Sequence, residues 1–304
     1  MTTVALARRT LAEKSKSFAL AGRLLPADVL DDMAILYAWC RHVDDAIDLV
    51  PPDEREAALA RLRAELDDAW SERGTLPLLT AFGDLARRRR MPREYADELL
   101  AGMEMDVRRV RYETLADLAL YCHRVAGVVG LMACHVLGIA DESALRRAAH
   151  LGIAMQLTNV SRDVEEDLAD GRVYLPRELV GELTTVPAPG TAERERVASA
   201  VRSLLDEADR YYRSADDGLA ALDARAALGI RVARRVYSAI GDVLRARGAD
   251  PFLGRAFVPT WKKLWLVGRS LLSSLAELPR RLGQRRTFTL PNRVIGFPHD
   301  VLPV

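Results

Sequence analysis

The chain has 304 residues with a formal net charge of +1, and 49% of them are hydrophobic and 29% charged. This length and apolar content suffice to bury a large core, and the near-neutral charge gives no reason to expect nucleic acid as a partner. The three cysteines, Cys40, Cys122 and Cys134, show no CxxC spacing. They indicate neither a disulfide framework nor a zinc site, and a reducing compartment is the simplest inference.

The N-terminal segment lacks the apolar core of a signal peptide. The longest apolar run extends from Val125 to Ile139 and is interrupted by two glycines and a histidine. At about fifteen residues it is too short to cross a bilayer and is more typical of a buried helix. We therefore expect a cytoplasmic protein, either soluble or bound to a membrane surface.

Nearly every segment has apolar residues at steps of three and four, with prolines and glycines between segments, which predicts helices throughout. The predicted helices are one ending near Ser15, a short one from Phe18 to Pro26, and longer ones over about 28–50, 53–72, 77–90, 93–111, 114–138, 143–169, 191–221, 223–247 and 259–282. We find no internal repeat and no long linker. Residues 1–283 are therefore predicted to form one all-α domain, a helical bundle, and residues 284–304 an extended tail that contains prolines.

One acidic stripe lies on the predicted helix 143–169. Asn159, Asp163 and Asp167 are four residues apart and share a helix face, with Gln156 one turn earlier. Side-chain oxygens on one stripe suit a hard cation such as Mg²⁺. A solvated helix face with a few acidic residues would show the same spacing, so the stripe alone does not decide between the two.

A second acidic cluster, Asp44, Asp45 and Asp48, ends the otherwise apolar helix 28–50. Their spacing allows all three carboxylates to converge, with Tyr37 and Arg41 on the same side. Carboxylates this close repel one another and raise each other's pKa unless cations hold them. A solvated helix end is the alternative interpretation.

Two such clusters facing each other across a bundle would bind two or three divalent ions, Mg²⁺ or Mn²⁺, which would in turn bind a diphosphate. Arg41 and Arg162 can complete this clamp, because a guanidinium matches phosphate oxygens in a bidentate fork. The surrounding helices are rich in Leu, Val, Ala and Ile. The sequence therefore predicts a diphosphate attached to a long hydrocarbon tail.

At these residues the sequence resembles the squalene/phytoene synthases, head-to-head prenyl transferases of the class I terpenoid synthase fold, a single-domain bundle with a central cavity. The resemblance covers about residues 10–275. The motifs that carry it, in order, are Ser15-Lys16-Ser17-Phe18, Tyr37…Cys40-Arg41…Asp44-Asp45…Asp48, Tyr121-Cys122…Val125-Ala126-Gly127-Val128-Val129-Gly130, the stretch from Gln156 to Asp167, and Asp170-Gly171-Arg172-Val173-Tyr174-Leu175-Pro176. Glu165 and Ser161 depart mildly from the family pattern.

The resemblance implies roles at matching positions. The implied metal ligands and ionising carboxylates are Asp44, Asp45, Asp48, Asn159, Asp163 and Asp167. The implied diphosphate and substrate contacts are Ser15, Lys16, Ser17, Arg41, Gln156 and Arg162, joined by Tyr237 and Arg255, for which a core position and a surface charge are the alternatives. The aromatic rings of Phe18, Tyr37 and Tyr121 are candidates to stabilise a carbocation, or are simply core aromatics.

Ala126, Gly127 and Gly130 lie in the long apolar helix, where each glycine costs about 1 kcal/mol relative to alanine. Close helix packing is one explanation. The other, which we favour here, is a local break that lets a substrate chain lie against the backbone.

The expected reaction joins two geranylgeranyl diphosphates into phytoene through a cyclopropyl diphosphate, the first committed step of carotenoid biosynthesis. Small residues at Gly22 and Ala34, where a bulky aromatic would shorten the pocket, favour C20 over C15 tails. NADPH is then not expected. The alternatives are a C15-using squalene, hydroxysqualene or dehydrosqualene synthase and, more remotely, a non-catalytic binding protein of the same family.

The last predicted helix carries Trp261 and Trp265 beside Lys262 and Lys263. Tryptophans bordered by basic residues suit a membrane surface, although a core-facing helix with solvated lysines fits as well. Because a C40 product is insoluble in water, we expect peripheral contact with the inner face of the cell membrane and with a downstream carotenoid desaturase.

Overall fold

The computed structural model describes residues 2–14, 22 and 25–282 of the chain, and every regular element within them is a helix. The prediction of an all-α bundle is confirmed. The elements are α1 (Thr3–Lys14), α3 (Ala27–Asp48), η1 (Pro52–Glu54), α4 (Arg55–Trp70), α5 (Pro77–Arg88), α6 (Arg93–Val107), α7 (Leu115–Cys122), η2 (His123–Gly127), α8 (Val128–Leu137), α9 (Glu142–Arg162), α10 (Val164–Ala169), α11 (Arg177–Val180), α12 (Ala192–Gly218), η3 (Leu219–Ala221), α13 (Ala224–Ala246) and α14 (Thr260–Leu282).

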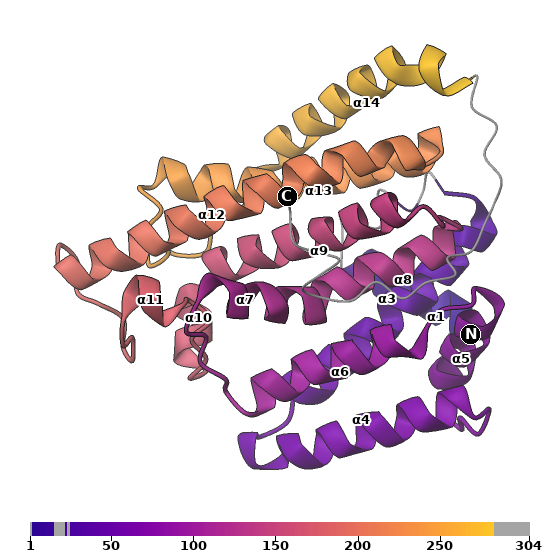
Figure 1. Cartoon of the computed structure of the whole chain (residues 1–304), viewed down its shortest axis with the longest axis horizontal. Coiled ribbons are helices and arrows are strands. Elements are labelled where there is room, and N and C mark those ends of the chain that lie inside the picture. The colour runs from indigo at the N-terminus through magenta and orange to yellow at the C-terminus, as the bar shows by residue number, and fades with distance from the viewer. Residues whose placement is uncertain (1, 15–21, 23–24, 283–304) are drawn as a thin grey trace.

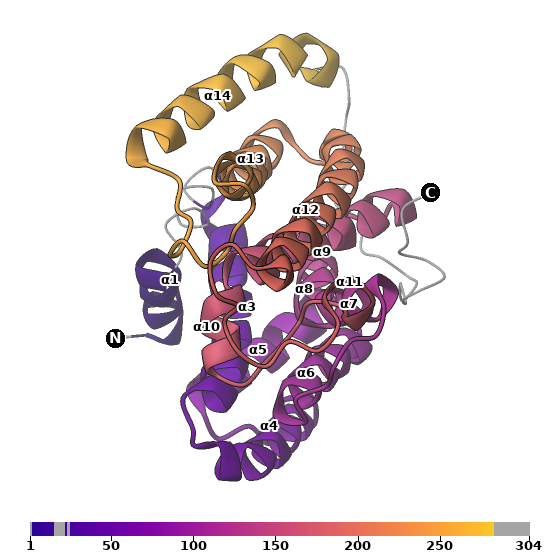
Figure 2. The ribbon, with the colours of Figure 1, turned by 90° about the vertical axis from the view of Figure 1, so that its left-hand side faces the viewer.

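Helix α9 runs through the middle of the bundle, where it packs against α12, α8, α7 and α13 (Figure 1). Helix α3 contacts α8, α5 and α4, so the chain's first half covers one side of α8 and the second half covers α9. Helix α14 lies at the periphery, beyond α13, in both views (Figure 2). Most buried apolar side chains belong to one contiguous cluster that includes Trp39 stacked on Phe82.

Helix ends follow from local side chains. Thr114 and Asp117 form a capping box at the start of α7, and the side chains of Asp141 and Asp223 accept backbone N–H groups at the starts of α9 and α13. Gly138 ends α8 with a positive φ of 66°, which favours glycine. These caps satisfy backbone N–H groups that have no partner within their own helix.

The predicted helix 114–138 is divided by a π-helical turn, His123–Gly127, between α7 and α8. The local break expected near Gly127 is therefore present. The whole run Leu115–Leu137 is long and apolar enough to cross a bilayer, yet 56% of its most apolar window is buried inside the bundle. Leu118, Leu131 and Val136 are completely buried within it, as expected of a core helix.

Three further predictions differ from the structure or fall outside it. The single helix predicted for 143–169 is two helices, α9 and α10, that meet at Asp163. The short helix α11 was not predicted. The tail 284–304 lies outside the described residues. So does most of the short helix predicted from Phe18 to Pro26, of which only Gly22, Leu25 and Pro26 are described.

Candidate active site

The two acidic clusters predicted from the sequence line a single cavity of about 500 Å³. One wall comes from α3 and the opposite wall from α9 and α10. The α3 wall contributes Tyr37, Cys40, Arg41, Asp44 and Asp48, and the opposite wall Gln156, Asn159, Val160, Arg162, Asp163 and Asp167. The facing arrangement inferred from two separate sequence motifs is therefore present in the fold.

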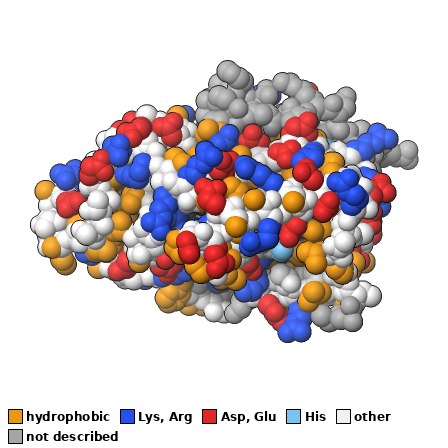
Figure 3. Space-filling model, turned by 90° about the horizontal axis from the view of Figure 1, so that it is seen from below, with side chains coloured by type: hydrophobic (Ala, Val, Ile, Leu, Met, Phe, Trp, Pro, Cys, Tyr) orange, Lys and Arg blue, Asp and Glu red, His pale blue; other side chains and the backbone are white. Residues whose placement is uncertain are grey.

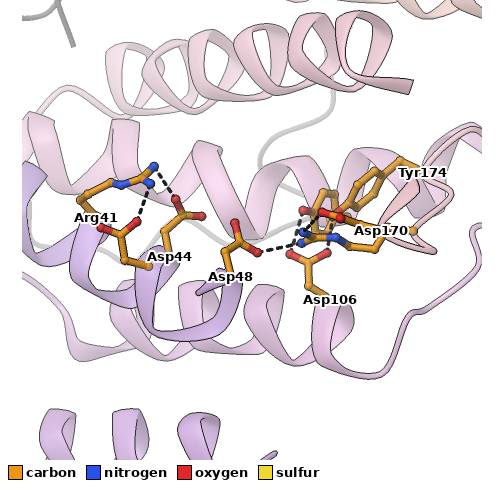
Figure 4. A network of polar contacts seen from close by, with 9 residues as sticks. Arg41, Asp44, Asp48, Asp106, Asp170 and Tyr174 are labelled. Carbon is orange, nitrogen blue, oxygen red and sulfur yellow. Dashed lines mark hydrogen bonds and ion pairs between the residues drawn. The ribbon is translucent and has the colours of Figure 1, made fainter. Parts of the chain in front are cut away.

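On the α3 wall, two arginines form ion pairs with the carboxylates. Arg41 Nη1 donates to Asp44 at 2.8 Å, and its other terminal nitrogen contacts Asp45. Asp48 accepts from Arg172 Nη1 at 3.0 Å (Figure 4). Asp45 is not among the residues that line the cavity, so the three carboxylates do not all converge on one point. Its described contact is with Arg41, at the border of the site.

On the opposite wall, Asp163 occupies the junction between α9 and α10. Its φ and ψ of −101° and 14° leave the helical range, yet its N–H still donates to Asn159 O at 2.9 Å. Asp167 N–H likewise donates to Asp163 O at 2.8 Å. The four-residue spacing therefore survives the break, which explains why all three side chains still border one cavity.

Asp163 is the most heavily paired carboxylate of the site. Arg162 Nε and Nη2 donate to it at 2.8 and 2.5 Å, and Arg255 approaches it at 3.3 Å. Arg255 also donates to Glu166 at 2.8 Å. Arg255, which is half-exposed, thus lies at the mouth of the cavity, and its contact with the leaving group stays a prediction.

Burial and mutual repulsion perturb the carboxylates on both walls. Desolvation, followed by the nearby charge of Asp48, raises the pKa of Asp44 to about 6. Desolvation and the charge of Asp163 raise the pKa of Asp167 to about 7. With these pKa values Asp44 is mostly ionised and Asp167 only about half ionised at neutral pH, so a bound cation would favour the ionised form of Asp167 in particular.

Several polar atoms of the cavity lack partners among the described residues. Asn159 donates through Nδ2 to Gln156 Oε1 at 3.3 Å, whereas its buried Oδ1 accepts no hydrogen bond there. The buried Nε atoms of Arg41 and Arg172 also find no acceptor. Buried polar atoms are normally paired. The unpaired amide oxygen suits a cation and the unpaired guanidinium nitrogens suit an anion, so the cavity fits a ligand that carries both charges.

The donor set fits Mg²⁺ or Mn²⁺. The polar ligands are carboxylate and amide oxygens, which hard cations prefer. Within the described part of the chain, no three His, Cys, Asp or Glu side chains are close enough to form a metal site by themselves. That also suits Mg²⁺, which is usually held by one or two carboxylates together with substrate phosphates and water rather than by a closed protein cage.

Next to Asp48, the cavity contains a group around Asp106, which the sequence analysis did not single out, although it named Tyr121 of the same group. Asp106 of α6 accepts hydrogen bonds from Tyr174 at 2.6 Å and Tyr121 at 3.0 Å (Figure 4). Tyr174 and Tyr121 stack with ring centroids 4.9 Å apart. Arg172 belongs to the same group, because it donates a hydrogen bond to Asp48 and its charge lowers the pKa of Asp106.

The electrostatics of this group fix its protonation. Burial raises the pKa of Asp106 to about 6, opposed by the hydrogen bond from Tyr174 and the charge of Arg172. Burial raises the pKa of Tyr121 and Tyr174 above their ordinary value. Both phenols therefore remain donors to Asp106. A sequence signal for this site exists: Asp106 continues the apolar stripe of Leu99 and Met103 on α6, where a charged residue is out of place.

Two further cavities, lined mainly by apolar residues, share lining residues with the first or with each other. A second cavity of about 150 Å³ shares Tyr37 and Cys40 with the first and is lined by Gly22, Leu25, Met33 and other apolar residues. A third of about 80 Å³ shares Ala133, Leu137 and Ile230 with the second. A prenyl diphosphate needs a polar compartment for its diphosphate and an apolar one for its tail. Gly22, which the sequence analysis expected to leave room for a long tail, lines the apolar cavity.

The remaining predicted residues are placed as follows. Tyr237 of α13 is close enough to Arg162 and Tyr37 to interact electrostatically with both. Ala34 is fully buried and does not line these three cavities. Residues 15–18, the predicted Ser-Lys-Ser-Phe motif, lie outside the described residues.

The glycine positions show mainly close packing. A Cβ at Gly130 would lie 2.3 Å from Ala148 O, and one at Gly152 would lie 2.2 Å from Ala126 O. At Gly127 the nearest atom would be in the His123 side chain, at 2.7 Å. The backbone of α9 therefore occupies the space in which a substrate chain was expected, and only Gly130 also borders the third cavity.

Comparisons with known proteins agree with this architecture. The sequence profile of the family described as squalene/phytoene synthase matches residues 11–262. A 15-cis-phytoene synthase of Enterobacter agglomerans is 37% identical over 278 residues, which cover 86% of this chain and 94% of that protein. A 15-cis-phytoene synthase of Pantoea ananas is 36% identical over 291 residues, covering 90% and 93%.

Solved structures give the same result. A dehydrosqualene synthase in complex with a ligand superposes with a TM-score of 0.79 at 26% identity and covers 90% of this chain and 96% of its own. A squalene synthase of Alicyclobacillus acidocaldarius gives a TM-score of 0.72 at 25% identity, covering 82% and 95%. The fold and the similarities define the class as an all-α prenyltransferase. Within that class, the chain belongs to the squalene/phytoene synthase family.

Proposed function

We propose that this protein is a phytoene synthase, which joins two geranylgeranyl diphosphates head to head. The observation that carries the proposal is the single cavity whose two facing walls are acidic and which shares the lining residues Tyr37 and Cys40 with an apolar cavity. The similarity to several 15-cis-phytoene synthases supports this product over C15-derived ones.

The proposal includes Mg²⁺ or Mn²⁺ as the cofactor. Asp44 and Asp48 would hold metal on the α3 wall, and Asn159, Asp163 and Asp167 on the opposite wall. When bound, the metal supplies positive charge that stabilises the departing diphosphate. The unpartnered Oδ1 of Asn159 and the raised pKa values of Asp44 and Asp167 support this assignment.

Arginines are proposed to exchange partners as substrate enters. Without ligand, Arg41, Arg162 and Arg172 neutralise Asp44, Asp163 and Asp48. With these carboxylates engaged by metal, Arg41, Arg162 and Arg172 would be free to bind diphosphate oxygens, for which a planar fork of donors is well matched. The acceptor-free Nε atoms of Arg41 and Arg172 already supply donors for that anion.

In the proposed reaction, the C–O bond of one allylic diphosphate breaks and leaves an allylic cation and diphosphate. The double bond of the second substrate attacks that cation, and loss of one proton closes a cyclopropyl diphosphate. Breaking the second C–O bond, rearrangement and loss of a second proton give phytoene. Two diphosphates and two protons are therefore released for each hydrocarbon, and no reductant is consumed, so NADPH is not required.

Residues around the cation have the task of excluding water and supplying negative charge. Asp106 fixes the hydroxyls of Tyr121 and Tyr174 and increases the negative charge on their oxygens. Both rings border the cavity, so their oxygens and ring faces are available to a carbocation. Because the group lies beside Asp48, stabilisation of the cation and binding of the leaving group are adjacent.

Cellular context is part of the proposal. Phytoene must be passed to an enzyme that introduces double bonds, so a carotenoid desaturase is the proposed partner and the cytoplasmic side of a membrane the proposed place of action. Co-purification with a desaturase from membranes, compared with the cytosolic fraction, tests both.

The reaction is tested with purified protein, Mg²⁺ and either geranylgeranyl or farnesyl diphosphate, with and without NADPH. We expect phytoene from the C20 substrate at a rate that NADPH does not change and that EDTA abolishes. Squalene formed from the C15 substrate with NADPH would identify a squalene synthase instead. No turnover of either substrate would favour a binding protein.

A further inference from the structure

Helix α14 directs its apolar face away from the protein. Eight of the thirteen exposed large apolar side chains among the described residues lie between Leu253 and Leu275. They are Leu253, Phe257, Trp261, Leu264, Trp265, Leu271, Leu272 and Leu275. Those on α14 follow the three- and four-residue spacing of one helix face. We call this set the α14 apolar face.

The opposite side of α14, which packs on α13, is mostly polar, although Leu266 is buried there in the main core. Arg235 donates to Ser270 at 3.2 Å and to Ser273 at 3.1 Å. Arg231 donates to Glu277 at 2.6 and 2.7 Å. Ser270 is completely buried and Arg231 nearly so. A surface helix normally buries its apolar stripe, so α14 has the reverse arrangement.

Because its apolar side chains point outward, α14 presents an apolar surface to a partner outside the protein. A contiguous exposed patch of this kind marks an interaction site in soluble proteins. The helix is anchored by Arg231 and Arg235 of α13, so its orientation does not depend on burying the tryptophans. In both views of the fold α14 also lies outside the bundle, with its main packing against α13 (Figures 1 and 2).

We propose that the α14 apolar face inserts into the interface of an anionic lipid bilayer. Tryptophan and leucine on one side of a helix, bordered by basic residues, suit the boundary between headgroups and acyl chains. Lys262, which pairs with Asp242 at 3.6 Å, and Arg269 lie two turns apart along one border, and Arg269 lies over the Trp265 ring at 5.4 Å. Between Thr260 and Glu277 the sole acidic residue is Glu277, which is paired with Arg231.

A second copy of the chain fits this surface less well. A symmetric contact would place each α14 apolar face against itself, which brings the basic border of one copy near that of the other with no acidic residue on the face to pair with it. A bilayer containing anionic lipids matches both the apolar and the basic parts.

The position of the surface relative to the cavity supports the same partner. Leu253 and Phe257 belong to the α14 apolar face, and Arg255 between them contacts Asp163 and Glu166 at the cavity mouth. The other side of the molecule differs. The face that includes α4 shows acidic and basic side chains interspersed across it (Figure 3). Docking through α14 would thus bring the mouth of the active site close to the lipid, which goes beyond the proposed function.

The test uses the full chain with vesicles, without substrate or Mg²⁺, so that its result is independent of turnover. Vesicles of phosphatidylcholine with 30% phosphatidylglycerol are prepared with and without brominated acyl chains, which quench tryptophan at short range. Trp261 and Trp265 are exposed, whereas Trp39 is buried against Phe82. We expect binding with a blue shift and quenching by the brominated lipid, and weaker binding to pure phosphatidylcholine.

The variant Trp261→Ser/Leu272→Ser removes two side chains that are each 70% exposed. It should lower the vesicle partition coefficient about tenfold or more and leave turnover of detergent-dispersed substrate unchanged. Leu76→Ser/Val186→Ser is the matched control, because these apolar residues are exposed away from α14, and it should change partitioning less than about twofold.

Three results overturn the proposal. Equal partitioning of the two double variants would show that α14 does not mediate binding. A dimer in lipid-free solution that becomes a monomer in Trp261→Ser/Leu272→Ser would identify a second copy as the partner. Vesicle binding that appears only after removal of residues 283–304 would show that this segment covers the face.

Discussion

Replacing Asp167 by asparagine is expected to stabilise the metal-free protein while it abolishes catalysis. The pKa of Asp167 rises from the ordinary 3.8 to about 7, because of burial and the charge of Asp163. At about 1.4 kcal/mol per pKa unit, keeping this group ionised at pH 8 costs the folded state on the order of 4 kcal/mol. Rearrangement of nearby arginines and water recovers part of that cost, so we expect a gain of about 2 kcal/mol in the free energy of unfolding.

The pH dependence of this gain follows from linkage. Because the folded-state pKa is raised, the folded protein binds more protons than the unfolded chain between about pH 4 and pH 7. The contribution of Asp167 to stability is fully present below that range and is lost as the pH rises through about 7. The advantage of Asp167→Asn should therefore be largest at pH 8 and should fall by more than half at pH 5.

Urea unfolding in EDTA at pH 5 and pH 8 measures this directly. Glu165→Gln is the matched control, since Glu165 is exposed on the same helix, α10, and it should change stability by less than about 0.5 kcal/mol. Adding Mg²⁺ should stabilise the wild type more than Asp167→Asn. A variant that is no more stable than the wild type at pH 8, or equally stabilised at both pH values, would refute the electrostatic account.

Three other substitutions test separate parts of the structure. Asp106→Asn should lower turnover about 10- to 100-fold with little change in metal binding, because the hydroxyls of Tyr121 and Tyr174 lose their charged acceptor; a loss of Mg²⁺ affinity in calorimetry would instead assign Asp106 to the metal site. Ala133→Phe should reduce the ratio of C20 to C15 turnover, because Ala133 borders both apolar cavities; an unchanged ratio would show that the tail does not pass this point. Gly130→Val should destabilise the protein by about 2–4 kcal/mol in urea unfolding, because its Cβ would meet Ala148 O at 2.3 Å; a neutral effect would contradict close packing of α8 and α9.

The sequence predicts the helices and the two acidic walls well, because both depend on local spacing. Apolar periodicity locates the helices, and the four-residue intervals place Asp44 with Asp48 and Asn159 with Asp163 on common faces. Facing of the two walls was inferred from chemistry alone: carboxylates on apolar helices require a shared cation. The cavity confirms that they face each other.

The other features depend on tertiary contacts that spacing does not encode. Asp45, like Asp44, is spaced so that it can share a helix face with Asp48. Its contact with Arg41 nevertheless leaves it outside the cavity lining. The break at Asp163 is another such feature, since no proline or glycine marks it, whereas the π-helical turn before Val128 includes Gly127, where the sequence predicts a local break. Gly130 packs against the backbone of α9 and also borders the third cavity, and only the folded arrangement shows both contacts.

The orientation of α14 shows the same limit. Its sequence has a polar side and an apolar side, and periodicity favours burial of the apolar one. Two arginines of α13 reverse this choice by pairing with Ser270, Ser273 and Glu277. Arg231 and Arg235 were not conspicuous among the many arginines of the chain. Their effect becomes visible once the two helices are side by side.

The central claim is that one cavity with two acidic walls condenses two C20 diphosphates. The most direct measurement incubates the purified protein with Mg²⁺ and an equimolar mixture of geranylgeranyl and farnesyl diphosphates, and quantifies hydrocarbons by mass and diphosphate released. We predict mainly phytoene, with two diphosphates released for each hydrocarbon. A C30 product formed in excess, or one diphosphate per product, would contradict the account.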